Sequence, residues 1–306
     1  LWGRRASDRS DIKLIWGIHH SVATLDNEKL ASRLLILGLA RASQRADIIV
    51  YSSAKSRTQH EGLGFLHERS MTIENGIDVN EFRPDPAARE RICKLASISP
   101  DRMIVGNVAR AHPMKDHPSF VRAIAEVAHR GRDVHGVIIG EGHTNGPAVQ
   151  VAQAIGISDR LSVIDLRTDL PELIPGFDVF LLSSKWGETF GISVAEAMSA
   201  GVPCVVTDLG DCANLVSDTG RTALPGDPKG MADAVISLID LSKEERENLG
   251  REARTRVTTL FSIAQHVQRT AAAYKQATDR RPPPGTTQQS DEQEERSKEP
   301  FGIRVR

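Results

Sequence analysis

Two glutamates near a glycine give the strongest chemical signal in the sequence. Seven residues lie between Glu188 and Glu196, and the run Phe190-Gly191-Ile192-Ser193 is among them. A helix that starts beside Gly191 would leave Glu188 in the preceding loop and place Glu196 about one turn into the helix. Carboxylates in these positions can accept hydrogen bonds from sugar or ribose hydroxyls, and the unpaired N–H groups of the helix end can bind a phosphate. Spacing alone also allows both glutamates to be solvated, or simply to favour the helix N-terminus electrostatically.

A second group of residues is cationic. Arg110 and Lys115 bracket a short loop between an expected strand, residues 103–108, and an expected helix that begins near Pro118. Ligands of a doubly wound sheet bind at the carboxyl ends of strands, where such loops lie. Arginine in fork geometry and lysine as a point charge could together clamp a diphosphate. Two exposed loop charges without a ligand are the alternative that these residues leave open.

Histidines follow the first expected strand. His19 and His20 stand together at its end. Because successive side chains of a strand alternate between its two faces, only one of the two is expected to point into a cleft. A structural histidine is the ordinary alternative for either residue.

An alternation of short β-branched segments and longer amphipathic ones must position these groups. This pattern indicates a parallel sheet flanked by helices. The helix near Pro118 has proline at its first position, and Phe120, Ile124 and Val127 recur on one face. The expected strands are residues 13–18, 47–52, 70–74, 103–108, 135–139, 161–165, 178–182 and 203–207, and the expected helices include 27–45, 118–129, 148–155 and 193–199.

Composition narrows the function classes. The chain has 306 residues, 39 Lys and Arg against 40 Asp and Glu, and this balance argues against a general nucleic-acid binder. Its three cysteines have neither a disulfide framework nor metal-ligand spacing and fit a reducing cytoplasm, and Cys204 lies in an apolar run typical of a core thiol. No apolar run is long enough to span a membrane, and no signal peptide is visible.

The ordered motifs resemble glycosyltransferase family 4, a group of retaining enzymes with the GT-B fold. That resemblance runs from about Ile15 to Tyr274. It implies an α/β protein with two Rossmann-like lobes, of which the second is a doubly wound parallel sheet. The motifs are Glu188-Thr189-Phe190-Gly191, Glu196-Ala197-Met198, Gly201-Val202-Pro203 and Thr207-Asp208, the loop from Arg110 to Lys115, the segments Asn75-Gly76-Ile77-Asp78 and Phe82-Arg83-Pro84, and Gly140-Glu141-Gly142.

The resemblance implies a nucleotide-sugar donor and assigns roles in binding it. Glu196 would hold the ribose hydroxyls, and Arg167 would line the base pocket. The substrate-binding set is completed by the run from Phe190 through Gly191 and Ile192 to Ser193, whose backbone N–H groups would contact the sugar and the distal phosphate.

The resemblance also implies which residues act on the reacting groups. Arg110 and Lys115 would neutralise the diphosphate, Glu188 would contact a hydroxyl of the transferred sugar, and His20 would face the cleft near that sugar. No Asp-x-Asp motif occurs in the chain, so we expect the two cations to replace a metal ion, with no metal site and no cofactor besides the donor.

The chain departs from the family at its beginning, where the glycine-rich loop of the first lobe is absent. We therefore expect an N-terminally truncated enzyme with an incomplete first lobe. The acceptor would be a glycan or a lipid-linked glycan of cell-surface polysaccharide assembly, and peripheral membrane contact would be made by the missing lobe. The expected divisions are 1–98 for the partial acceptor-side lobe, 99–260 for the nucleotide-sugar lobe, 261–279 for a crossover helix and 280–306 for a disordered tail.

Two rival functions remain open at this point. A truncated module could bind nucleotide sugars without transferring the sugar. A nucleotide-sugar 2-epimerase could use the same scaffold, although the acid/base carboxylates that it needs in both lobes are not visible. A dehydrogenase is disfavoured because no Gly-x-Gly-x-x-Gly opens a helix after a strand.

Overall fold

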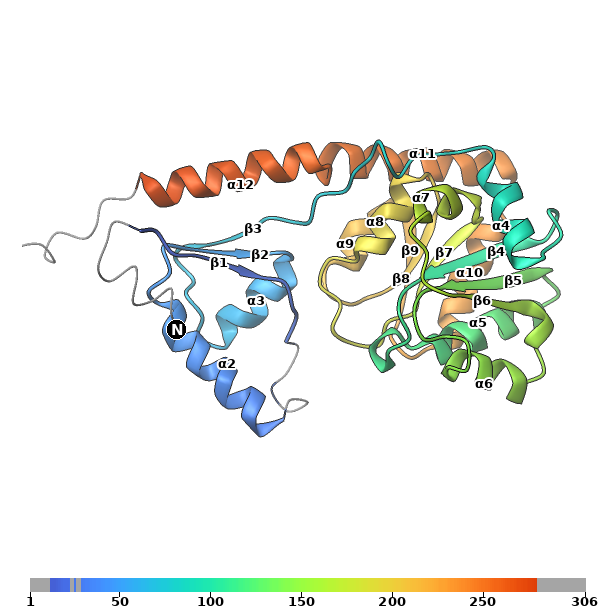
Figure 1. Ribbon diagram of the computed structural model, residues 1–306, viewed down its shortest axis with the longest axis horizontal. Helices are drawn as coiled ribbons and strands as arrows, with labels where there is room; N and C mark the ends of the chain where they lie inside the picture. The colour runs from blue at the N-terminus through green and yellow to red at the C-terminus, as the bar shows by residue number, and fades with distance from the viewer. Residues whose placement is uncertain (1–11, 23–24, 26–28, 280–306) are drawn as a thin grey trace, which may run out of the picture.

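Two parallel β-sheets organise the computed structural model, which describes residues 12–22, 25 and 29–279. Each sheet forms the centre of its own lobe (Figure 1). This is the expected two-lobed α/β architecture. The expected disordered tail, 280–306, lies outside the described residues, as do residues 27 and 28 of the first expected helix.

The first lobe has a three-stranded sheet in the order β1-β2-β3. Its strands pair in parallel, and Ile18 of β1 lies opposite Tyr51 of β2. A small core that includes Ile49, Tyr51 and Phe65 lies between the sheet and its helices. The elements are β1 (Ile15–Ile18), α2 (Leu30–Ser43), β2 (Ile48–Tyr51), α3 (Ala54–Gly62) and β3 (Ser70–Thr72).

The second lobe has a six-stranded parallel sheet in the order β6-β5-β4-β7-β8-β9. The chain runs outward from β4 to β6 and then returns to place β7 beside β4, so the switch point of this doubly wound sheet lies between β4 and β7. The strands are β4 (Met103–Val108), β5 (Val134–Ile139), β6 (Leu161–Ile164), β7 (Val179–Leu182), β8 (Cys204–Thr207) and β9 (Gly220–Ala223).

Consecutive strand residues of this sheet enter two different cores. Phe180 and Leu182 pack with the helices of one face, whereas Val179 and Leu181 pack with those of the other. Because both faces are covered, the central strands β7 and β8 are buried along their whole length. One face carries α5 (His117–His129), α6 (Pro147–Ala154) and α10 (Pro228–Ile239), and the other carries α4 (Ala88–Ala96), α7 (Leu170–Leu173), α8 (Ile192–Ser199), α9 (Cys212–Val216) and α11 (Lys243–Leu260).

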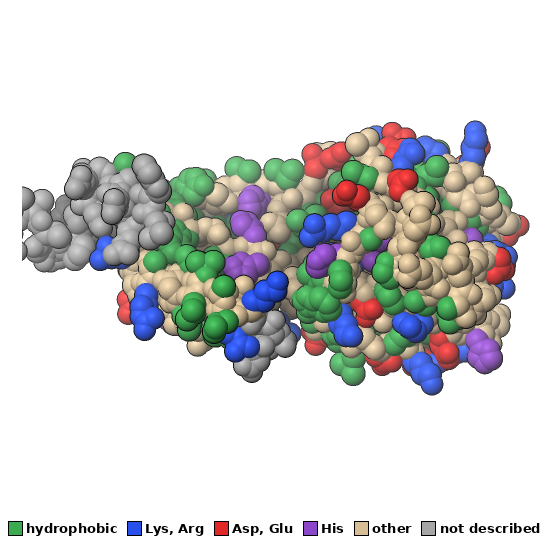
Figure 2. Space-filling view, turned by 60° about the horizontal axis from the view of Figure 1, so that its bottom comes forward, with side chains coloured by type: hydrophobic (Ala, Val, Ile, Leu, Met, Phe, Trp, Pro, Cys, Tyr) green, Lys and Arg blue, Asp and Glu red, His purple; other side chains and the backbone are tan. Residues whose placement is uncertain are grey.

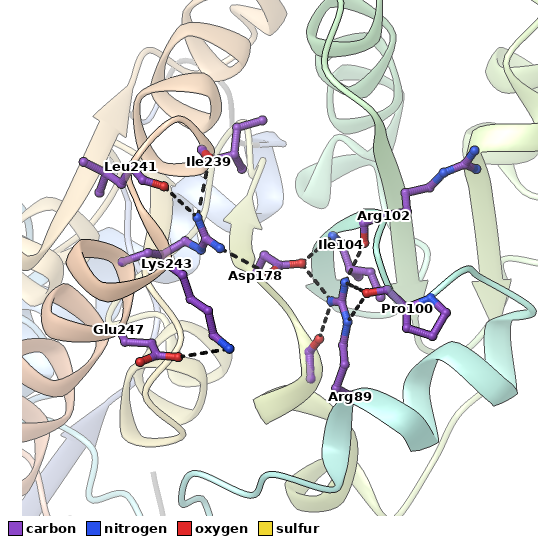
Figure 3. A network of polar contacts seen from close by, with 11 residues as sticks. Arg89, Pro100, Arg102, Ile104, Asp178, Ile239, Leu241, Lys243 and Glu247 are labelled. Atoms are coloured by element: carbon purple, nitrogen blue, oxygen red, sulfur yellow. Dashed lines mark hydrogen bonds and ion pairs between the residues drawn. The ribbon is translucent and has the colours of Figure 1, made fainter.

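A polar network fixes the amino edge of the second sheet. Asp178, just before β7, accepts hydrogen bonds from the Ile104 backbone N–H and from Arg89 of α4, each at 2.8 Å. Arg246 of α11 lies 3.8 Å from the same carboxylate. Figure 3 shows how Arg89 also reaches the carbonyls of the segment before β4. Helix α4, which precedes the expected boundary at residue 98, is thereby attached to the second lobe.

The last described helix returns to the first lobe. Helix α12 (Ile263–Thr278) lies along the first lobe, whereas α11 lies on the second (Figure 1). The backbone of Ile77 pairs with the chain on either side of Ser262, through N–H···O distances of 2.8 Å to Phe261 and 3.0 Å from Ile263. The two segments that connect the lobes are thus hydrogen-bonded to each other.

Candidate functional site

Two loops meet at the switch point of the second sheet. One follows β4 and the other follows β7, and these strands are neighbours through Val105 and Val179. The Lys185 N–H donates to the Met114 carbonyl at 2.7 Å, and the Ser183 hydroxyl donates to the Lys115 carbonyl at 2.8 Å. The carboxyl ends of the strands therefore carry one continuous loop cluster, as expected for a ligand site of this fold.

Lys115 and Glu188 face each other across these loops. The Lys115 Nζ contacts Glu188 Oε1, and the same oxygen accepts a hydrogen bond from the Ser184 hydroxyl at 2.6 Å. Glu188 is 8% exposed. A lysine ammonium has three donors, so Lys115 can keep this contact and still bind an anion.

Arg110 lies on the same loop with its guanidinium exposed, and it has no side-chain partner among the described residues. Its neighbours are fixed, because Ala109 donates to the Ile139 carbonyl at 3.1 Å and Ala111 donates to the Glu141 carbonyl at 2.7 Å. The exposed Arg110 guanidinium is thus carried by a loop whose backbone is fixed by hydrogen bonds.

Buried polar side chains support this loop from beneath. The Asn107 amide donates to the Leu181 carbonyl at 2.7 Å, which leaves its oxygen to accept from His117 Nε2 at 3.2 Å. His143 Nε2 lies 2.8 Å from the Ala109 carbonyl. Burial, with smaller contributions from His143 and Lys115, lowers the pKa of His117 to about 3. His117 is therefore neutral and supports the cationic loop without adding charge.

Gly191 starts helix α8 in the left-handed region, with φ of +89°. An added Cβ would be strained there and would lie 3.0 Å from the Cys212 sulfur. Gly191 offers no side-chain cap, and the N–H groups of Ile192 and Ser193 donate to no acceptor in the described part of the chain. This helix end can therefore bind an anion or a sugar oxygen. Phe190 itself is buried and packs edge-to-face on Phe261, with ring centroids 5.3 Å apart.

Glu196 lies in the second turn of α8, half-buried. Burial, and secondarily the charge of Glu81, raises its pKa to about 7. Glu81 belongs to the segment between the lobes. Arg254 of α11 holds that segment against α8 by donating to the Val79 and Phe82 carbonyls at 2.9 Å.

The two remaining predicted residues lie apart from this cluster. Arg167 forms an ion pair with Asp169 two positions later, so its guanidinium already has a partner. His20 lies at the end of β1 in the first lobe, where its Nε2 is 3.4 Å from His60 Nε2. On the face shown in Figure 2, histidines of the first lobe lie opposite basic and histidine side chains of the second.

The structure thus brings Lys115 and Glu188 into contact and places Arg110 and the start of α8 on the same edge of the sheet. Sequence reasoning missed Ser184, Glu81 and the residues that attach the lobes to each other. A serine two residues after a strand is a common feature that gives no functional signal, and Glu81 acts only through the tertiary placement of its segment.

Known proteins share this fold. The crystal structure of HepE from Anabaena in complex with UDP superimposes with a TM-score of 0.79 and 21% identity, covering 89% of this chain and 75% of that one. This similarity, with two facing α/β lobes and a site at the switch point, defines the fold as GT-B.

The second lobe matches a known protein family, and most of the chain is similar in sequence to known enzymes. Residues 100–241 match the family described as Glycosyl transferases group 1. The lipopolysaccharide core biosynthesis mannosyltransferase LpsB of Rhizobium meliloti is 27% identical over 248 residues, or 76% of this chain and 66% of that protein. The N-acetyl-alpha-D-glucosaminyl L-malate synthase of Bacillus anthracis is 25% identical over 267 residues, or 86% of this chain and 68% of that protein. The chain spans about two thirds of the length of these two relatives.

The second lobe therefore contains a match to the group 1 glycosyl transferases, a family of transferase enzymes, over residues 100–241. Within the described residues, no helix is both long and apolar enough to cross a bilayer.

Proposed function

We propose that this chain provides the donor site of a retaining glycosyltransferase that moves a sugar from a nucleoside-diphosphate sugar to a glycan or lipid-linked acceptor. The observation that carries the proposal is the Lys115–Glu188 contact beside the unpaired start of α8. Cation, carboxylate and helix end together match a sugar diphosphate, whose phosphates accept hydrogen bonds and whose sugar hydroxyls donate them.

The departure of the nucleoside diphosphate builds negative charge on the bridging oxygen. Lys115, Arg110 and the N–H groups of Ile192 and Ser193 would stabilise that charge most strongly in the transition state. The sugar would lie against Glu188, and the ribose hydroxyls against Glu196. No protein base is assigned, because in front-face attack with retention the departing phosphate accepts the proton of the acceptor hydroxyl.

Cell-surface polysaccharide assembly is the setting that we propose. LpsB is named for lipopolysaccharide core biosynthesis, and the HepE structure contains UDP. LpsB therefore suggests the setting for this chain, and HepE suggests a nucleotide-sugar donor. The second candidate, which the sequence leaves open, is a module that binds nucleotide sugars without transferring the sugar.

Calorimetric titration of the chain with UDP, GDP and ADP, and with UDP-glucose and GDP-mannose, tests the proposal. We expect the chain to bind one of these nucleotides at a single site. The Lys115→Ala variant should bind the same nucleotide at least about tenfold more weakly, because it loses a charged contact. Absence of binding to all five ligands would reject the donor site. Binding without release of nucleoside diphosphate in the presence of acceptor glycans would favour the non-transferring module.

A further inference from the structure

One carboxylate of the second lobe reaches into the first. Asp211, at the start of α9, accepts hydrogen bonds from the backbone N–H groups of Ala54 at 2.6 Å and Lys55 at 3.0 Å. These are the first two residues of α3. Asp211 is 8% exposed, so the contact is shielded from solvent.

The contact satisfies the start of α3, not the start of α9. The first N–H groups of a helix are unpaired and carry its positive dipole end, so a carboxylate there is favourable. Ser53 caps α3 locally by accepting from Ser56, and Asp211 takes the two donors that this cap leaves. The Asp211 side chain makes no capping hydrogen bond to its own helix. Lys55 also approaches Asp208, at 3.8 Å, in an exposed pair that contributes less.

On the second lobe, Asp211 is joined to the loop of the donor site. Its backbone N–H donates to the Thr189 carbonyl at 2.7 Å, between Glu188 and Phe190. Gly210 before it has φ of +54°. A Cβ on this glycine would lie 2.3 Å from the Thr189 oxygen and 2.5 Å from the Glu188 oxygen. The two loops therefore pack too closely to move independently.

On the first lobe, α3 holds His20. The Ser56 hydroxyl donates to the His20 carbonyl at 2.6 Å. His60, one turn later, is buried, and its Nδ1 lies 2.8 Å from the Ser56 carbonyl, which assigns the proton to Nδ1. His60 Nε2 is then an acceptor for His20 Nε2 at 3.4 Å.

We propose that Asp211 is a positioning residue that sets α3, and through it His20, against the donor loop. This inference rests on the proposed function, because His20 matters for transfer only if the sugar lies near the Glu188 loop. It predicts that Asp211 acts on the rate of transfer and not on the affinity for the nucleotide.

Asp211→Asn and Asp211→Ala form a graded series, since asparagine keeps one carbonyl acceptor and alanine keeps none. We expect kcat to fall at least about tenfold in Asp211→Ala and less in Asp211→Asn, while the Kd for the nucleotide stays within about threefold. Asp227→Asn is the matched control, because Asp227 caps α10 within the second lobe by accepting from Gly230. Its kcat should equal that of the wild type.

Hydrogen exchange gives a readout independent of catalysis. The Ala54 and Lys55 amides should exchange faster in Asp211→Ala than in the wild type. Their exchange rates in Asp227→Asn should equal those of the wild type. The imidazole NMR signal of His20, assigned with His20→Gln, should shift only in the Asp211 variants. Unchanged exchange and an unchanged His20 signal, or a kcat equal to the wild type, would overturn the proposal. A wild-type chain that binds no nucleotide would reject the donor site instead, and exchange and the His20 signal would still decide the role of Asp211.

Discussion

Lys115 and Glu188 lie 73 positions apart in the chain, yet the ammonium of one contacts the carboxylate of the other at the switch point of the second sheet. Glu188 is also bonded to the Ser184 hydroxyl, so its carboxylate is fixed from two sides. The ion pair therefore fixes the Lys115 ammonium near the start of α8, whose first N–H groups are unpaired within the described residues.

Removing either loop cation should slow transfer. Arg110→Ala and Lys115→Ala should each reduce kcat/KM by about 10²-fold, because each loses a contact with the charge that develops on the leaving group. Steady-state kinetics in a reaction with donor and acceptor measures this. Arg122→Ala is the control, since Arg122 is an exposed cation on α5 without a partner in the described chain. Near-wild-type turnover of both loop variants would contradict the proposed role.

Lys115 and Glu188 should also be coupled in stability. Lys115→Ala and Glu188→Ala should each lower the free energy of unfolding by about 1–3 kcal/mol, because each removes one partner of an ion pair that is largely shielded from solvent. The double variant should lose less than the sum of the two single changes. Urea unfolding of the four proteins gives the coupling energy. Strict additivity would mean that the contact contributes nothing to the folded state.

Binding of a nucleotide sugar should strengthen as the pH rises. The pKa of Glu196 is raised to about 7, and its ionised form is the stronger acceptor of hydrogen bonds from ribose hydroxyls. Between pH 6 and pH 8 the ionised fraction rises about tenfold, and affinity should follow. Calorimetry with the nucleotide sugar measures this affinity. A nucleotide sugar is used because the terminal phosphate of a free nucleoside diphosphate itself titrates.

Glu196 should also make the stability of the fold depend on pH, in the direction opposite to its effect on binding. Its folded pKa exceeds the usual value of 4.5, so the folded state retains this proton while the unfolded state releases it. Glu196 therefore lowers stability as the pH rises from about 4.5 to 7. Glu196→Gln should remove the contribution of this group to both dependences, and Glu81→Gln should move their midpoint to lower pH by removing a nearby negative charge. A wild-type affinity that is flat from pH 6 to 8 would exclude this role.

Metal removal should leave transfer unchanged. In the proposed function, Arg110 and Lys115 would supply the positive charge for which many glycosyltransferases recruit a divalent ion, so we expect that excess EDTA does not lower kcat. Turnover is measured with and without the chelator, and then after adding Mg²⁺. Loss of turnover in EDTA with recovery in Mg²⁺ would refute metal-independent catalysis.

The sequence predicts most of the second lobe because its signals are local. The eight expected strands correspond to β1 to β8, and the buried stripe of Phe120, Ile124 and Val127 lies on α5 as its spacing indicates. Cys204 is a buried thiol, as predicted. Strand β9 was not predicted, because Gly220-Arg221-Thr222-Ala223 has one β-branched residue and is a strand only through pairing with β8.

The site was less accessible to sequence reasoning. The left-handed start of α8 follows from Gly191, since glycine adopts that conformation without strain. The contact of Asp211 with Ala54 joins residues 157 positions apart, and no local pattern marks it. Likewise, nothing near Glu196 in sequence indicates that Glu81 lies close enough to raise its pKa.

The backbone pairing of Ile77 with Ser262 restricts how the two lobes can move relative to each other. The two segments that connect the lobes lie side by side and are hydrogen-bonded to each other. We therefore expect the lobes to open as a hinge about one line and not to twist freely about a single connection. Any opening would separate Asp211 from α3, and any reclosing would return them in the same register.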